Sequence, residues 1–159
     1  MTGRAALEAE ISADVRRLSA ESEQIGRIFA ARHDLGLSDF RALTHIMVAE
    51  SEGAALTAGQ LRSRLGLSGA AVTYLVERLI DSGHITREAD PADRRKVILR
   101  FAEHGMTVAR AFFTPLAAHT HRELADLPDE DLAAAHRVFG ALAGAMRAFE
   151  AEQEDPPKP

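Results

Sequence analysis

Residues 57–101 constrain the fold of this chain more than any other stretch, because two short helix signals and a hairpin signal follow one another without a spacer. Thr57 and Gln60 have the spacing of a capping box, in which each side chain accepts a hydrogen bond from the backbone N–H of the other residue. Gly66 suits the left-handed position that ends a helix. The pattern therefore predicts a short helix over residues 58–65.

A second helix is expected directly after this turn, from Ser68 as its N-cap to Ser82. Two helices about three residues apart, with a glycine in the turn, form a helix-turn-helix. One side of the second helix is apolar at helical spacing and should be buried, with Val72, Leu75, Val76, Leu79 and Ile80. The other side carries Ala70, Thr73, Tyr74, Glu77 and Arg78. Such side chains suit the major groove of DNA, although for one helix taken alone an ordinary solvated face is the simpler interpretation.

A hairpin should follow the second helix. Alternating residues over 85–88 and 97–101 predict two strands, and the Asp-Pro-Ala-Asp sequence of residues 90–93 predicts the turn between them. Three cations come directly after this turn, Arg94, Arg95 and Lys96. A thin arm that ends in arginine suits the minor groove. Asp93 can orient one of these arginines by a charge-assisted hydrogen bond.

The charge of the chain is unevenly distributed. The whole sequence has a net charge of −5, which by itself argues against nucleic-acid binding. Residues 57–101, however, hold 8 basic and 5 acidic side chains, a local charge of +3, whereas the remainder holds 11 basic and 19 acidic ones, a charge of −8. Such asymmetry is expected when one lobe faces a polyanion, and chance unevenness is the alternative.

Long helices are expected at both ends of the chain. Apolar residues at helical spacing predict an amphipathic helix from Arg4 to about Ala31, which at about 1.5 Å per residue is longer than a small lobe needs and should pack along a partner. Ser38 is a plausible N-cap for the next helix. A further helix begins at Glu103, and Pro115 should kink or break it near Ala111.

The last helix should begin at the acidic residues 129–131 and run to about Glu150. Gly140 and Gly144 lie four residues apart in it and would permit close approach of another helix. The composition of residues 152–159 predicts a disordered tail.

The run from Leu56 to Gly105, LTAGQLRSRLGLSGAAVTYLVERLIDSGHITREADPADRRKVILRFAEHG, resembles the winged helix-turn-helix core of the MarR transcription regulators. The Leu-Gly-Leu-Ser turn, the Asp-Pro-Ala-Asp-Arg-Arg wing and the glycine after the last strand carry the resemblance, and the order of elements extends it to nearly the whole chain. Two positions depart from the family pattern, His84-Ile85 at the start of the first strand and Phe101-Ala102, where a threonine commonly caps the next helix.

The resemblance implies a set of DNA-binding residues. On the second helix they are Ser68, Gly69, Ala70, Thr73 and Tyr74. In the wing, Arg95 would enter the minor groove while Asp93 holds it, and Arg94 and Lys96 would meet phosphates. Arg62 and Arg78 complete the predicted set.

The resemblance also implies a mainly α fold with a small β wing, in a single MarR-like domain over residues 1–159. Residues 38–101 would form the winged helix-turn-helix lobe, and residues 4–36 and 103–150 a helical lobe that interlocks with a second copy in a homodimer. Two recognition helices about 34–36 Å apart would then read the two halves of a palindrome.

The seven histidines raise the question of metal binding or effector binding. His119 and His121 are two residues apart on a helix and point away from each other, so they do not chelate one ion. His33 and His45 flank the junction where the resemblance places small anionic or aromatic effectors, and each is more often a satisfied or exposed histidine. We expect no metal and no cofactor, and the common catalytic motifs are absent from the sequence.

The sequence thus predicts a cytoplasmic, ligand-responsive regulator, a repressor and not an enzyme, that binds double-stranded DNA as a homodimer. No apolar run approaches the roughly 18 residues of a membrane span. The alternative hypothesis is a winged-helix module that binds another protein without specific DNA binding. Loss of the Arg95 side chain and the dependence of binding on salt distinguish the two.

Overall fold

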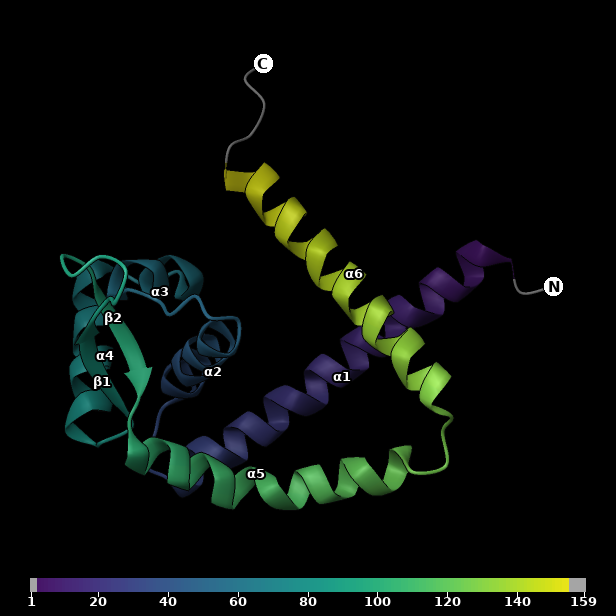
Figure 1. Ribbon diagram of the computed structural model, residues 1–159, viewed down its shortest axis with the longest axis horizontal. Helices are drawn as coiled ribbons and strands as arrows, with labels where there is room; N and C mark the ends of the chain where they lie inside the picture. The colour runs from purple at the N-terminus through teal and green to yellow at the C-terminus, as the bar shows by residue number, and fades with distance from the viewer. Residues whose placement is uncertain (1–2, 155–159) are drawn as a thin grey trace. The chain divides into compact units, whose positions relative to one another are not determined.

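The computed structural model describes residues 3–154, which form six helices and a two-stranded antiparallel sheet (Figure 1). Contacts divide the chain into two compact units, Met1–Phe113 and Thr114–Pro159. The first unit holds α1 (Arg4–Arg32), α2 (Leu37–Ser51), α3 (Ala58–Leu65), α4 (Gly69–Asp81), β1 (Ile85–Ala89), β2 (Val97–Phe101) and the first half of α5 (Glu103–Leu124). The second unit holds the rest of α5 and α6 (Asp129–Glu154). These elements confirm the predicted mainly α fold with a small β wing.

The hairpin gains a third extended segment from outside it. β1 and β2 pair in antiparallel register from Ile85 opposite Phe101 to Ala89 opposite Val97. On the other side of β2, the Leu99 N–H donates to the Leu56 carbonyl at 2.7 Å. The segment that leads into α3 therefore fixes the base of the wing to the helix-turn-helix.

The core of the first unit lies where α2, α3, α4 and the wing meet. Its largest fully buried apolar side chains come from all of these elements, Ile46, Leu61, Leu79, Ile85, Leu99 and Val76. α1 contributes only through its C-terminal part, since its buried residues are Gly26, Phe29 and Ala30. A Cβ at Gly26 would lie 2.3 Å from Cε1 of Phe40, so this glycine allows the Phe40 ring to pack against α1.

The expectation that Ser38 caps α2 is wrong. The helix begins at Leu37, and Gly36 occupies the N-cap position with extended backbone. The Gly36 N–H donates to Oδ2 of Asp39 at 2.7 Å. A carboxylate from the first turn of the helix therefore performs part of the capping that was expected of a hydroxyl group.

The expected break in α5 does not occur, and the helix is continuous through Pro115. Proline removes the hydrogen bond to the carbonyl of Ala111. Because Ala111 is exposed, water can satisfy that carbonyl without a break in the helix. The predicted end of the last helix at Glu150 is also too early, since α6 continues to Glu154.

This extension shortens the predicted tail. Residues 152–154 are helical and were expected to be disordered, whereas residues 155–159 lie outside the described residues. Over residues 3–154, no helix combines the length and the hydropathy needed to cross a membrane.

Candidate nucleic-acid interface

The turn between α3 and α4 has the geometry that the sequence predicts. Thr57 Oγ1 accepts from the Gln60 N–H at 3.2 Å, and Gln60 Oε1 accepts from the Thr57 N–H at 2.9 Å. Gly66 adopts a left-handed conformation with φ of 63°. Ser68 Oγ then accepts from the Ala71 N–H at 3.2 Å, which caps α4. These local bonds fix the direction in which α4 leaves the turn.

α4 buries one side and exposes the other. Val72, Leu75, Val76 and Leu79 are buried. The predicted contact residues on the other side are all exposed, namely Ser68, Gly69, Ala70, Thr73 and Tyr74. Tyr74 is the most prominent of them, with 68% of its surface exposed. We call these five residues the exposed face of α4. Side chains of this kind can approach base edges, and their contact with DNA stays a prediction.

Arg78 differs from the other predicted contact residues because it is bonded inside the protein. Its Nη2 donates to Oδ1 of Asp39, which is fully buried. The side chain of Arg78 remains 40% exposed, and its guanidinium lies 5.2 Å from the centroid of the Tyr74 ring. The hydrogen bond to Asp39 raises the pKa of Arg78, so this guanidinium is charged at any physiological pH.

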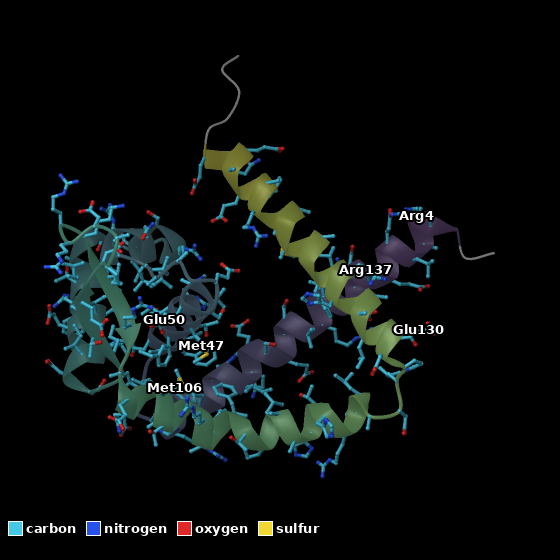
Figure 2. The ribbon with its side chains drawn as sticks, viewed as in Figure 1. Arg4, Met47, Glu50, Met106, Glu130 and Arg137 are labelled. Carbon is cyan, nitrogen blue, oxygen red and sulfur yellow. The ribbon has the colours of Figure 1, made fainter. Side chains whose placement is uncertain are left out.

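The wing is anchored to the end of α2 by a carboxylate. Glu50, labelled in Figure 2, accepts from the Phe101 N–H at 3.3 Å and from Nη1 of Arg100 at 3.5 Å. Arg100 also lies 3.8 Å from Glu88 on the paired strand. No local sequence pattern indicates this role of Glu50, because its partners lie about 50 positions further along the chain. This anchor holds the base of the wing while the tip extends from it.

The tip of the wing is built from two aspartates and one arginine. Oδ1 of Asp90 accepts from the Ala92 N–H at 2.8 Å, which closes the turn. Oδ1 of Asp93 accepts from both the backbone N–H and Nε of Arg95 at 3.1 Å. Oδ2 of Asp93 accepts from Nη2 of the same arginine at 3.4 Å. The predicted pairing of Asp93 with one of the wing arginines is therefore present.

Arg95 is held in place and is almost fully solvent-accessible. Its side chain is 91% exposed although two of its nitrogens bond Asp93. The side-chain hydrogen bond from Arg95 lowers the pKa of Asp93, with a further contribution from the Arg95 backbone N–H. A cation fixed at the end of a thin arm suits the narrow, strongly negative minor groove.

The other predicted cations are exposed around this arm. Arg94 and Lys96 flank Arg95, and neither is buried. Arg62 lies on α3, where its Nε donates to the Leu67 carbonyl across the helix-turn-helix turn at 3.3 Å. All three side chains are therefore placed where phosphates could approach them, and their contact with DNA stays a prediction.

The passage from the wing into α5 depends on Gly105, the glycine after the last strand that carries part of the family resemblance. A Cβ at Gly105 would lie 2.2 Å from the carbonyl oxygen of His84. The Gly105 N–H donates to the Gly83 carbonyl at 3.2 Å, and the Ala102 N–H donates to the His84 carbonyl at 2.9 Å. These backbone bonds serve the start of α5, where the family pattern has a capping threonine.

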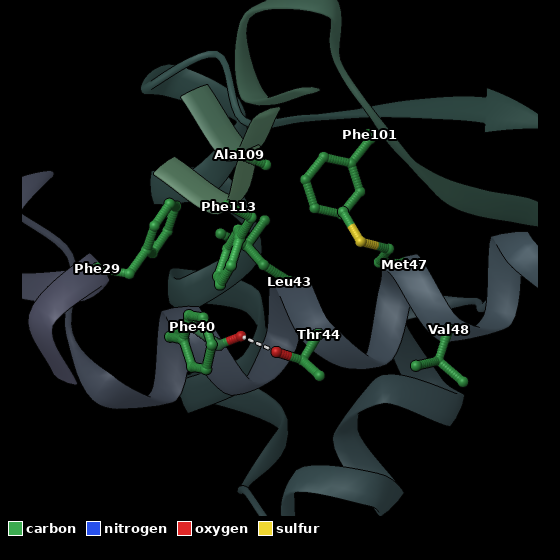
Figure 3. A pocket seen from close by; sticks show the side chains of 9 residues that line it. All are labelled: Phe29, Phe40, Leu43, Thr44, Met47, Val48, Phe101, Ala109 and Phe113. Carbon is green, nitrogen blue, oxygen red and sulfur yellow. Dashed lines mark hydrogen bonds between the residues drawn. The ribbon is translucent and has the colours of Figure 1, made fainter. Parts of the chain in front are cut away.

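An apolar pocket of about 270 Å³ lies in the first unit between α1, α2, β2 and α5 (Figure 3). It is lined by Phe29, Phe40, Leu43, Thr44, Met47, Val48, Phe101, Ala109 and Phe113. Thr44 is the polar residue among them, and its hydroxyl donates to the Phe40 carbonyl at 3.0 Å. The lining thus suits an uncharged aromatic or aliphatic molecule.

Neither histidine proposed for effector binding lines this pocket. His33 lies behind it, with its ring centroid 4.7 Å from that of Phe29. His45 lines a second and more polar hollow together with Ser22, Glu23, Leu37, Phe40, Arg41 and Thr44. The structure therefore does not bring His33 and His45 into one site. In the described part of the chain, no three His, Asp or Glu side chains converge as metal ligands would.

A helix pair joined by a tight glycine turn and followed by a hairpin with a basic tip defines a winged helix-turn-helix protein. Residues 33–96, which hold the helix pair, β1 and the wing tip but not β2, match the model of the MarR family.

A curated relative and solved structures are also similar to this chain. The chain is 33% identical over 96 residues to YcgE, an uncharacterized HTH-type transcriptional regulator of Bacillus subtilis. The matched region spans 60% of this chain and 62% of YcgE. A mutant of MepR from a multidrug-resistant S. aureus clinical isolate has a TM-score of 0.69 at 17% identity, over 86% of this chain and 96% of that one. S. aureus MepR in complex with DNA has a TM-score of 0.52 at 18% identity, over 85% and 98% of the two chains.

Proposed function

We propose that this protein is a transcription regulator that binds double-stranded DNA sequence-specifically, with the exposed face of α4 in the major groove and Arg95 in the minor groove. The observation that carries the proposal is the wing tip, where Asp93 holds a 91% exposed arginine at the end of the hairpin. MepR, whose fold this chain shares, is solved in complex with DNA, which supports the same use of the fold.

We further propose that the protein acts as a homodimer on a two-fold symmetric operator. The helices at the two ends of the chain support this proposal, because they leave apolar side chains exposed. Leu7 and Leu18 on α1 are exposed, as are Phe139, Met146 and Phe149 on α6. A second copy that covers these helices would place two α4 helices on one duplex, and the combined contact would exceed a weak monomer contact.

The apolar pocket supports a response to a small ligand. Phe29 of α1 and Phe113 of α5 meet residues of α2 and β2 in its wall. A ligand in this pocket would change how the wing and the helix-turn-helix are held, and DNA affinity would fall without any contact at the bases. Repression in the absence of ligand and release on binding is the sense of regulation that we propose.

The apolar lining also sets the chemistry of that ligand. Uncharged aromatic compounds should raise the melting temperature of the protein, whereas benzoate, an aromatic of similar size with a charge, should not. An equal shift with benzoate would contradict the apolar assignment and would direct attention to the hollow beside Arg41 and His45.

Arg95→Ala and Arg94→Ala form a matched pair that tests the DNA-binding proposal. Each variant removes one exposed cation from the same loop, so their nonspecific electrostatic effects are similar. Arg95→Ala should lose most of its specific affinity for DNA selected from a random pool. Its preference for particular bases should weaken at the base pairs next to those that α4 contacts in the major groove. Arg94→Ala should lower affinity by a similar factor on all sequences and reduce the salt dependence. Equal base preference in the two variants would show that Arg95 is not a minor-groove contact.

A further inference from the structure

A buried carboxylate lies beneath the exposed face of α4. Asp39 is fully buried in the first turn of α2. Both of its oxygens are used, since Oδ2 accepts from the Gly36 N–H at 2.7 Å and Oδ1 accepts from Nη2 of Arg78. The carboxylate therefore links the corner between α1 and α2 to α4, which begins 30 positions after Asp39.

The arginine at the other end of this link supports Tyr74. The guanidinium of Arg78 lies 5.2 Å from the centroid of the Tyr74 ring, within range of a cation–π contact. Tyr74 has 68% of its surface exposed. A tyrosine with no support on a helix surface samples several side-chain rotamers. The flat guanidinium beside its ring limits that choice, and its own orientation is limited by Asp39.

We propose that Asp39 is a positioning residue that fixes the orientation of Tyr74 through Arg78, and so helps to set which bases α4 reads. The inference rests on the proposed DNA-binding function and adds to it a residue that does not reach the surface. The order of contacts runs from Gly36 to Asp39, then to Arg78 and to Tyr74.

A role in stability alone does not account for this arrangement. An ion pair with a fully buried carboxylate contributes little net stability compared with apolar side chains of the same volume, because that carboxylate must be desolvated. What the pair provides is direction, since a planar guanidinium bonded to a fixed carboxylate holds a defined plane. Gly36 adds to the fit, because a Cβ there would lie 3.3 Å from Oδ2 of Asp39 and 3.9 Å from Nη2 of Arg78.

Asp39→Asn tests the proposal with a minimal change of shape. An amide has one accepting oxygen and one donating nitrogen. Because both oxygens of Asp39 accept hydrogen bonds, each orientation of the amide places a donor against either Gly36 N–H or Arg78. Asp34→Asn is the matched control, since Asp34 is an exposed acid near the same corner. Its φ of 52° is one that asparagine also adopts readily.

Arg78→Lys is the second variant, in case Asp39→Asn does not fold. Lysine keeps a positive charge beside Asp39 but has no flat group to lie against the Tyr74 ring. Each variant is used to select DNA from a random pool at fixed salt. The fraction of protein that can bind DNA is measured first, so that partial unfolding is not mistaken for weaker binding. We expect the preference for the best base to fall by about tenfold at the base pairs that Tyr74 faces. The slope of log affinity against log salt should stay that of the wild type.

The outcomes separate this inference from the function on which it rests. If the wild type selects no sequence, the proposed function fails, and the inference fails with it. If the wild type and Asp34→Asn select one site and Asp39→Asn or folded Arg78→Lys selects the same site with the same base preferences, only the inference is overturned. An affinity loss that is uniform over all sequences would likewise reduce Asp39 to a structural role.

Discussion

A buried histidine at the base of the wing makes the stability of this protein depend on pH. His84 is 5% exposed, and its Nδ1 lies 2.8 Å from the hydroxyl oxygen of Ser82. Its Nε2 is buried without a hydrogen-bond partner among the described residues. The ring faces that of His104 on α5, with 5.6 Å between the centroids. A second proton on this ring would thus place a charge on a buried side chain whose Nε2 has no hydrogen-bond partner among the described residues.

Burial lowers the pKa of His84 below its ordinary value, and the nearby His104 and His33 lower it further, while Asp39 opposes them. The neutral ring is therefore the form that the folded protein favours. At a pH above the ordinary pKa of about 6.5, both the folded and the unfolded chain hold the ring neutral, and stability is complete. As the pH falls below that value, the unfolded chain takes up a proton first, so the free energy of unfolding decreases.

The size of this decrease follows from the binding of one proton. Each pH unit below about 6.5 removes at most about 1.4 kcal/mol, until the folded protein also takes up the proton. Between pH 7.5 and pH 5.5 we therefore expect His84 to remove up to about 1.4 kcal/mol. His84→Leu replaces the imidazole with an apolar side chain that cannot bind a proton. This variant should therefore lack this part of the pH dependence.

Urea denaturation followed by circular dichroism at pH 7.5, 6.5 and 5.5 measures the effect. The decisive quantity is the difference in free energy of unfolding between wild type and His84→Leu at each pH, because contributions from the rest of the chain cancel in it. His136→Asn, at an exposed position on α6, is the control and should keep the pH dependence of the wild type. A difference between wild type and His84→Leu that does not change with pH would refute the reasoning.

Two further substitutions test close contacts. Gly105→Ala places a Cβ against the His84 carbonyl, where a distance of 2.2 Å leaves no room, and should destabilise the protein by about 1–3 kcal/mol in the same urea assay; an unchanged midpoint would contradict the close approach. Asp93→Ala makes the wing more positive, which by charge alone would strengthen DNA binding, yet it releases Arg95. We expect weaker binding by up to roughly tenfold in fluorescence anisotropy, and stronger binding would mean that Asp93 does not hold Arg95 in a productive orientation.

The parts of the fold that the sequence predicts are those whose signals are local. The Thr57–Gln60 box, the left-handed Gly66 and the Ser68 cap each depend on residues within a few positions of one another. The same holds for the Asp93–Arg95 pair, whose members are two residues apart. Local bonds of this kind form in any context that permits the backbone conformation, and the structure contains all of them.

The parts that the sequence did not predict depend on distant partners. Ser38 has the better cap composition, but Asp39 is held by Arg78, and the helix begins one residue before Ser38. Proline inside a helix commonly breaks it, because it removes a backbone hydrogen bond. In α5 the carbonyl that loses its hydrogen bond belongs to the exposed Ala111, and the helix continues. The apolar pocket also has no sequence signal, because its lining residues look like ordinary core positions along α1, α2 and α5.

The identity of the DNA-contact residues remains a proposal that joins a family resemblance to geometry. The structure holds the exposed face of α4, the wing tip and the exposed Arg62 of α3 in the first unit. Arg78 differs from those residues, because one nitrogen of its guanidinium is hydrogen-bonded to the buried Asp39. We expect Arg78 to act on DNA mainly through Tyr74.

Selection of DNA from a random pool by the wild-type protein is a direct test of sequence-specific binding. We expect one enriched site with two-fold symmetry and half-sites about one helical turn apart, bound with an affinity that falls steeply as salt is raised. A pool that stays random, together with binding that does not depend on salt, would contradict it and would favour a winged-helix module that binds another protein.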